Sequence, residues 1–219
     1  MKMKKYKAII TDFDLTIADT AFLIEDCLYT NASRFGYDLD RKILRDGIGM
    51  TAESIYLDAG CSAPEAKKLH DEYIPYSAEI MREKTELYPG VAEGLRDLRE
   101  NGILLAVLSL KSSDQIWRPL ERAGVDGLMH SVISPDEVEA HKPEPDGIYY
   151  LSEKTGIALS DILYVGDSMT DMKTAQNAGV DFAAVCTGAV TAESFAEMGA
   201  GMIYPTFARM CKTLCKELD

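Results

Sequence analysis

Long hydrophobic runs are missing from this 219-residue sequence, and no stretch approaches the length that a transmembrane helix needs. The basic start of the chain is followed by an apolar run too short for a signal peptide. Its five cysteines are scattered without a CxxC pair, which favours reduced thiols over a disulfide framework. We therefore expect a cytoplasmic protein with no membrane association.

Positive charge is also scarce, since 23 Lys and Arg face 36 Asp and Glu, for a net charge of −13. An acidic surface repels nucleic acid and anionic membranes, so we expect neither as a partner. A small anionic substrate is still possible, because a bound metal can reverse the local field. The length suits one core with a small insertion. We expect a monomer or a homodimer, a choice that the sequence leaves open.

The stretch KAIITDFDLTIADT, residues 7–20, organises the chain. Its apolar run suits a buried strand, and the strand stops at Asp12 and Asp14. Ligands of open α/β sheets bind at the carboxyl ends of strands. Two carboxylates two residues apart on an extended chain point the same way, which indicates a divalent metal or a shared proton. The alternative is an acidic loop that only caps a helix.

Strand-like and helix-like segments alternate through the second part of the chain. Expected strands are 103–108, 129–133, 162–165, 182–186 and 201–204, and expected helices are 91–100, 113–123, 145–155, 169–178, 191–198 and 207–217. This alternation predicts an α/β fold with a doubly wound, Rossmann-like parallel sheet covered on both faces.

The segment after the first strand is helical throughout, with expected helices at 21–35, 41–45, 51–59 and 63–84. It interrupts the strand–helix rhythm and therefore predicts an inserted α-helical cap. We expect a core domain of residues 1–17 and 87–219 and a cap domain of residues 18–86. The hinges would lie near 18–22 and 84–90.

Further polar residues follow other expected strands or precede their helices, namely Ser109, Lys142, Asp167 and Asp171. If the strands are parallel neighbours, these side chains converge with the first two carboxylates at one sheet edge. Taken singly, each has another explanation. Ser109 could cap a helix, and Lys142 could be a solvated loop residue. Asp171 could be an acidic residue at a helix N-terminus that interacts favourably with the helix dipole.

Such a set has a definite chemistry. Four carboxylates in one crevice need a hard cation, and Mg²⁺ suits carboxylate and water ligands. A hydroxyl and a lysine beside them suit a phosphate. Hydrolysis of a phosphate monoester requires a barrier reduction of roughly 20 kcal/mol. A carboxylate nucleophile that forms an aspartyl-phosphate, later cleaved by water, provides a route.

In order along the chain, DFDLT, Ser109, Lys142 and GDSMTD resemble the four motifs of the haloacid dehalogenase superfamily of aspartyl-phosphate phosphatases. The motifs span the core, and the helical insertion resembles the small α-helical cap of that superfamily. The nearest group is the one similar to phosphoglycolate phosphatase and β-phosphoglucomutase. This resemblance implies a phosphatase acting on a small phosphorylated metabolite, with a phosphomutase and a non-catalytic phospho-ligand sensor as alternatives.

The resemblance also implies roles for individual residues. Asp12 is the expected nucleophile and Asp14 the expected general acid/base. Ser109 and Lys142 are expected to hold the transferring phosphoryl group. Thr16 is also expected among the phosphate-binding residues, where it would steady the loop.

Metal ligands follow from the same resemblance. Asp12 and Asp167 are expected to bind Mg²⁺ directly, and Asp14 through its backbone carbonyl. Asp171 is expected to bind the metal through water or to orient Lys142.

Two features of the sequence bear on substrate choice. Leu15 stands where the superfamily usually has glycine. The leucine side chain would narrow the pocket or change the loop. The segment RDGIGM, residues 45–50, is a glycine-rich turn between cap helices that could reach the active site. Arg45 at its start is a candidate contact for an anionic leaving group, or else a surface charge.

Overall fold

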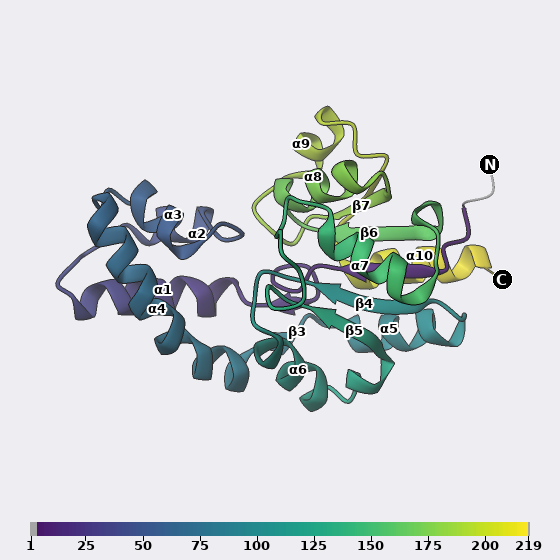
Figure 1. Ribbon diagram of the computed structural model, residues 1–219, viewed down its shortest axis with the longest axis horizontal. Helices are drawn as coiled ribbons and strands as arrows, with labels where there is room; N and C mark the ends of the chain where they lie inside the picture. Colours follow the sequence, from purple (N-terminus) through teal and green to yellow (C-terminus); the bar gives the residue numbers. More distant parts are fainter. Residues whose placement is uncertain (1–3, 219) are drawn as a thin grey trace.

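A computed structural model describes residues 4–218 of the chain. Its main sheet has six strands, all parallel, in the order β5-β4-β1-β6-β7-β8 (Figure 1). The strands are β1 Ala8–Thr11, β4 Leu104–Leu108, β5 Met129–Ile133, β6 Ile162–Gly166, β7 Asp181–Val185 and β8 Met202–Tyr204. This arrangement confirms the predicted α/β fold. The observed ends of the strands differ from the expected ones by about one residue.

Strand β1 lies in the middle of this sheet, between β4 and β6. Ile10 of β1 is opposite Ala106 on one side and Tyr164 on the other. All four residues of β1 are buried, as expected for a strand covered on both faces. Because the three strands are parallel and in register, their carboxyl ends meet at one edge.

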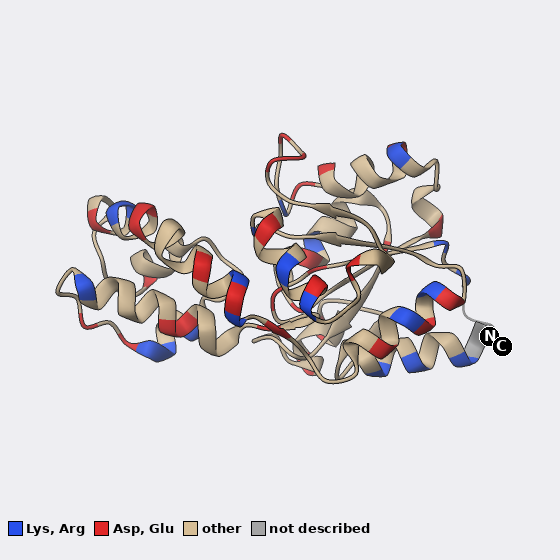
Figure 2. Cartoon of the chain, turned by 90° about the horizontal axis from the view of Figure 1, so that it is seen from below, with Lys and Arg blue, Asp and Glu red and all other residues tan. Residues whose placement is uncertain are grey.

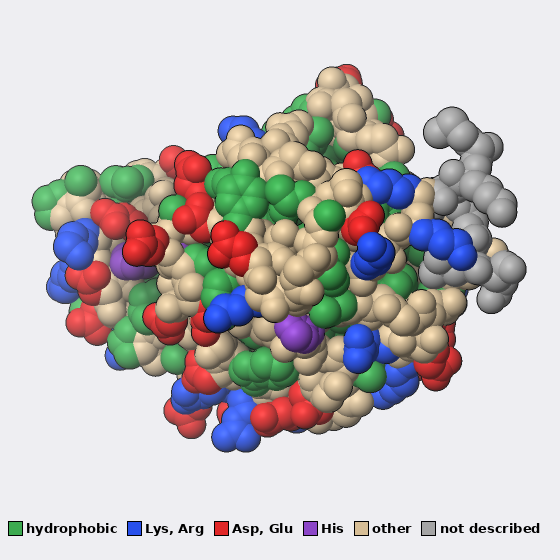
Figure 3. All heavy atoms as spheres, turned by 45° about the vertical axis from the view of Figure 1, so that its right-hand side comes forward, with side chains coloured by type: hydrophobic (Ala, Val, Ile, Leu, Met, Phe, Trp, Pro, Cys, Tyr) green, Lys and Arg blue, Asp and Glu red, His purple; other side chains and the backbone are tan. Residues whose placement is uncertain are grey.

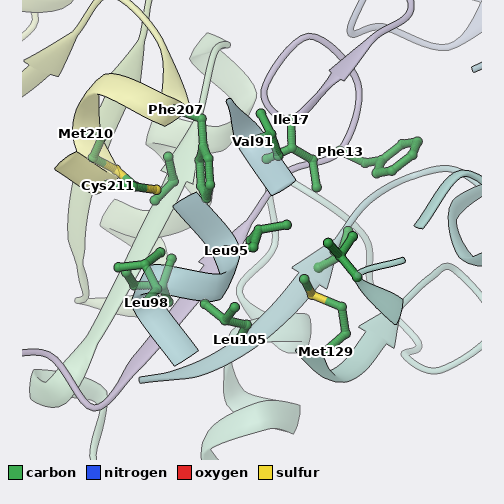
Figure 4. Close-up of a cluster of buried hydrophobic side chains, with 14 of the residues drawn as sticks. Phe13, Ile17, Val91, Leu95, Leu98, Leu105, Met129, Phe207, Met210 and Cys211 are labelled. Atoms are coloured by element: carbon green, nitrogen blue, oxygen red, sulfur yellow. The ribbon is translucent and has the colours of Figure 1, made fainter. Parts of the chain in front are cut away.

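Helices cover both faces of the sheet, as predicted. One face carries α5 Val91–Glu100, α6 Ser113–Arg122 and α10 Phe207–Leu218, and the other carries α7 Asp146–Thr155 and α8 Met169–Ala178. The shorter α9, Ala192–Glu197, packs through Phe195 beside β7 and β8. Figure 4 shows the first face, where α5 and α10 bring leucine, methionine and phenylalanine side chains together over the strands.

The segment between β1 and α5 forms a separate group of helices, here called the cap helices. They are α1 Ala21–Arg34, α2 Arg41–Asp46, α3 Ala52–Asp58 and α4 Ala63–Lys84, and they stand beside the sheet in Figure 1. Their buried hydrophobic cluster runs from Ile24 to Met81 and contains no residue of the sheet. The cap helices thus have a hydrophobic core of their own.

A two-stranded antiparallel ribbon joins the cap helices to the sheet, where the sequence predicted only hinges. It consists of β2 Ala18–Asp19 and β3 Glu86–Leu87. Strands of two residues are too short to show the alternation that identifies a strand in a sequence. The ribbon ties together the two places where the chain crosses between sheet and cap.

Charged residues of both signs are interspersed over the helices, while the strands of the sheet are largely free of them (Figure 2). On the face seen in Figure 3, hydrophobic side chains reach the surface in small groups separated by acidic and basic ones. Among the described residues, the buried acidic side chains are Asp12, Asp167 and Asp171 near the carboxyl edge of the sheet and Glu25 in α1.

Candidate active site

The carboxyl ends of β1, β4 and β6 place Asp12, Ser109 and Asp167 together, and all three side chains are buried. The backbone N–H of Asp12 donates to the carbonyl of Val165 at 2.8 Å, so the β1–β6 pairing continues to Asp12. The N–H of Ser109 likewise donates to Ile133 O at 3.1 Å. Sheet hydrogen bonds therefore fix the backbone of these residues up to the site.

Lys142 lies in the loop before α7 and reaches under this edge. Its ammonium group donates to Asp12 Oδ1 and to Asp171 Oδ1, each at 2.8 Å, and its side chain is only 6% exposed. The convergence predicted for Asp12, Lys142, Asp167 and Asp171 is thus present. Carboxylate oxygens of Asp12, Asp167 and Asp171 all lie within 4.8 Å of one another.

Crowding of buried carboxylates shifts their protonation. Burial raises the pKa of Asp12 to about 7, although the charge of Lys142 opposes the shift. Burial, with the charge of Asp12, raises the pKa of Asp167 well above its ordinary value. For Lys142, burial works to lower the pKa, but the two neighbouring carboxylates outweigh it and hold the pKa above the usual value. The site has more negative charge than one ammonium group can balance.

Asp14 has a cationic partner that sequence reasoning missed. Lys111 Nζ lies 3.0 Å from Asp14 Oδ2, and the side chain of Lys111 is 10% exposed. The other oxygen of Asp14 is buried and has no hydrogen-bond partner within the described residues. The sequence does contain a signal for this contact: Lys111 lies two residues after Ser109, just past a strand that ends at the site.

Thr16 is placed differently from the prediction. Its hydroxyl donates to Asp167 Oδ1 at 2.8 Å, and the residue is fully buried. It is not among the described residues that line the cavity above the site, and its hydroxyl binds the Asp167 carboxylate instead. A Cβ atom on Gly188 would lie 1.9 Å from Asp167 Oδ2, so glycine at that position lets the loop pass close to the carboxylate.

Asp171 lies in the first turn of α8 and forms a capping box with Ser168, the residue before the helix. The Ser168 hydroxyl donates to Asp171 Oδ2 at 2.5 Å, and the N–H of Asp171 donates back to that hydroxyl at 3.2 Å. Tyr164 of β6, also missed by sequence reasoning, donates its hydroxyl to Asp171 Oδ1 at 2.8 Å. Both oxygens of Asp171 accept hydrogen bonds, and Oδ1 accepts from both Lys142 and Tyr164.

Arg45 does not face the site. Its guanidinium pairs with the buried Glu25, with Nε 2.5 Å from Glu25 Oε2, and its side chain is 61% exposed. Glu25 also pairs with Arg41 at 2.9 Å. The expected contact of Arg45 with a leaving group is therefore wrong for this structure, because a buried carboxylate on α1 holds the arginine away from the cavity.

The loop after Arg45 does reach the site, as the sequence suggested. Ile48, Gly49 and Met50 line the cavity, and a Cβ atom on Gly49 would lie 3.9 Å from Cβ of Ser168. Leu15 also lines this cavity, and it has a left-handed backbone conformation with φ of 58°. Its side chain therefore occupies a backbone position that favours glycine.

A cavity of about 360 Å³ opens between the strand ends and the cap helices. Asp12, Asp14, Ser109, Lys142 and Asp167 line its floor. This volume is in the range of small-molecule sites. Buried carboxylates, a lysine and a hydroxyl beneath a helical cap form a site whose groups suit phosphoryl transfer.

The comparisons with known proteins give the family. The haloacid dehalogenase-like hydrolase family matches residues 9–185, and the chain belongs to this family. It is 28% identical to phosphoglycolate phosphatase of Pasteurella multocida over 97% of this chain and all of the relative. It is 27% identical to N-acetylmuramic acid 6-phosphate phosphatase of Pseudomonas aeruginosa, over 88% of this chain and 87% of that one.

Solved structures agree with this assignment. A haloacid dehalogenase-like hydrolase from Bacteroides fragilis superposes with a TM-score of 0.86 at 28% identity, covering 94% of this chain and all of that one. The chain is a phosphatase of this family. Within residues 4–218, no helix is both long and apolar enough to cross a membrane.

Proposed function

We propose that this phosphatase hydrolyses a small phosphate monoester through an aspartyl-phosphate on Asp12, with Mg²⁺ as its cofactor. The observation that carries the proposal is the position of Lys142, which bridges Asp12 and Asp171 at 2.8 Å beneath a cavity that Asp14 also lines. A lysine held against the nucleophile is placed to bind the oxygens of a phosphoryl group attached there.

The donor set fits a hard divalent cation. Three carboxylate oxygens, one each from Asp12, Asp167 and Asp171, lie within 4.8 Å of one another, and burial raises the pKa of both Asp12 and Asp167. We assign Asp12 and Asp167 as the direct ligands, with the backbone carbonyl of Asp14. When bound, Mg²⁺ supplies positive charge that offsets the repulsion between a carboxylate nucleophile and an anionic phosphate.

The reaction has two halves. A carboxylate oxygen of Asp12 attacks phosphorus, the bond from phosphorus to the leaving oxygen breaks, and Asp14 gives its proton to that oxygen. Asp14 then takes a proton from water, the water oxygen attacks phosphorus, and the bond to Asp12 breaks to release phosphate. Ser109 and Lys142 hold the phosphoryl oxygens in both halves.

We further propose the division into a core of residues 1–17 and 87–219 and a cap of residues 18–86. The separate hydrophobic cluster of the cap helices supports it, and the β2–β3 ribbon lies at the expected hinges. Closure of the cap over the cavity excludes water from the first half-reaction.

The test is phosphate release from a panel of phosphorylated metabolites, measured with Mg²⁺ and with EDTA. Asp12→Asn should lower kcat by at least about 1,000-fold, since it removes the nucleophile. Asp58→Asn, an exposed substitution on α3 with the same change of charge, serves as control and should leave release unchanged. Binding of these esters with no release would favour a phospho-ligand sensor. Conversion of a hexose 1-phosphate without release would favour a phosphomutase.

A further inference from the structure

The wall that the cap helices contribute to the cavity is mainly apolar. It includes the side chains of Ile24, Leu28, Ile48, Met50, Ile55 and Ile74. Met50 and Ile74 are 46% and 51% exposed, and Leu110 on the core side of the same cavity is 39% exposed. Large exposed hydrophobic side chains gathered at one opening are typical of a surface that binds an apolar group.

No lysine or arginine among the described residues of the cap helices lines that wall. Among the described residues that line the cavity, the lysines are Lys111 and Lys142, both from the core. Each is already paired with a carboxylate of the site. The arginines of α2 lie elsewhere, held by Glu25. A carboxylate carried by the leaving group and directed at the cap would thus be desolvated without a counter-ion, which is costly.

One polar group on the cap wall has hydrogen-bonding capacity to spare. His70 of α4 lines the cavity, and its Nδ1 atom is buried with no partner within the described residues. The neighbouring polar groups are engaged: Ser77 Oγ donates to Ile74 O at 3.4 Å, and Thr51 caps α3 through Ser54. A buried imidazole nitrogen without a partner is satisfied by a ligand that offers a single hydrogen bond.

We propose that the leaving group is an uncharged alcohol with an apolar body and one hydrogen-bonding group that meets His70. The substrate class is then the phosphate monoester of an aromatic or branched neutral alcohol, and phosphoglycolate, whose leaving group carries a carboxylate, is disfavoured. This inference rests on the proposed phosphatase function and concerns the cap side of the same cavity.

The first experiment compares kcat/KM for benzyl phosphate and for 2-phosphoglycolate with Mg²⁺ present. The wild-type chain should prefer benzyl phosphate by about tenfold or more. Ile74→Arg places a cation at the apolar mouth and should shift the ratio toward 2-phosphoglycolate by about tenfold, mainly through KM. Leu57→Arg is the matched control, because Leu57 is 42% exposed on the cap but does not line the cavity, and it should leave the ratio unchanged.

A second pair of substrates tests His70. A hydroxybenzyl phosphate should be turned over with a higher kcat/KM than benzyl phosphate, and His70→Phe should bring the ratio of the two kcat/KM values close to one. Thermal melting of each variant shows whether it folds as the wild type does. An advantage that survives His70→Phe would contradict the assignment of His70.

Binding of phosphonates separates this inference from the proposed function. Calorimetry with benzylphosphonate and phosphonoacetate requires no turnover. Tighter binding of benzylphosphonate, shifted by Ile74→Arg, supports the inference even if no ester is hydrolysed and the phosphatase mechanism fails. Tighter binding of phosphonoacetate, or a preference for 2-phosphoglycolate in the kinetics, overturns it even if the mechanism stands.

Discussion

Leu15 is the position where this chain departs from glycine, and its backbone has φ of 58°. The surrounding loop holds it there, since its N–H donates to Ala18 O at 2.9 Å and its carbonyl accepts the hydroxyl of Thr187. The side chain is 5% exposed. Truncation of this residue therefore changes two opposed quantities, the apolar burial and the backbone strain. Comparison of Leu15→Ala with Leu15→Gly separates them.

Both variants lose the buried side chain, but only glycine also relieves the left-handed strain. That strain is about 1–2 kcal/mol for a residue with a Cβ atom. Apart from this strain, a glycine variant is less stable than an alanine variant by about 0.5–1 kcal/mol because the unfolded chain has more entropy. It loses about 0.8 kcal/mol more because the buried methyl group is missing. At Leu15 these amounts offset one another, so the glycine variant should be at least nearly as stable as the alanine variant. Both should be less stable than the wild type.

Leu28 provides the matched control. It also lines the cavity, is fully buried, and lies in the right-handed backbone of α1. At this position the free energy of unfolding of the glycine variant should be about 1–2 kcal/mol lower than that of the alanine variant, since no strain is relieved. The free energies of unfolding are measured by urea denaturation, with m-values compared. If the glycine variant were less stable than the alanine variant by as much at Leu15 as at Leu28, the reasoning would be refuted.

Two further predictions concern the charged floor of the site. Tyr164→Phe removes the hydrogen bond to Asp171 and should lower kcat/KM by roughly tenfold with the fold retained, because a bond to a charged group contributes about 1.5–3 kcal/mol; steady-state kinetics alongside thermal melting check this, and an unchanged kcat/KM would contradict it. In EDTA, Asp12 with its pKa raised to about 7 binds a proton more tightly in the folded state than in the unfolded state. Its contribution to stability is therefore present below pH about 4 and is lost as pH rises to about 7. The melting temperature of the wild type minus that of Asp12→Asn should fall between pH 5 and pH 8, and Mg²⁺ should restore it at pH 8. A difference that is constant with pH would count against the raised pKa.

Much of the fold and of the site's floor could be predicted from the sequence, for a physical reason. Strands buried on both faces are continuous apolar runs, so the residues where they stop are visible in the chain. Asp12, Ser109 and Asp167 are such residues, and parallel neighbours necessarily bring them to one edge. Lys142 has no such signal from periodicity and was found by its resemblance to a motif.

Side-chain partners on the cap and around the floor were harder to predict. Arg45 has the right sequence position to contact a substrate, but the buried Glu25 on another helix holds it away. Thr16 lies in the first motif, yet its hydroxyl serves Asp167, which is 151 residues distant in the chain. Lys111 pairs with Asp14 from a neighbouring strand end. These contacts depend on tertiary distances of a few ångströms, which no local pattern encodes.

The β2–β3 ribbon connects the cap helices to the loop that follows Asp14. Ala18 pairs with Leu87 across the ribbon, and its carbonyl accepts the N–H of Leu15, the residue after Asp14. The N–H of Tyr88 donates to Ile17 O at 3.0 Å, so both chain crossings are bonded to the same loop. A movement of the cap helices about the ribbon must therefore either leave this loop intact or displace Asp14. Because the bond that holds Leu15 in its left-handed conformation belongs to the same set, relief of that strain by glycine should also loosen the coupling between movement of the cap helices and the position of Asp14.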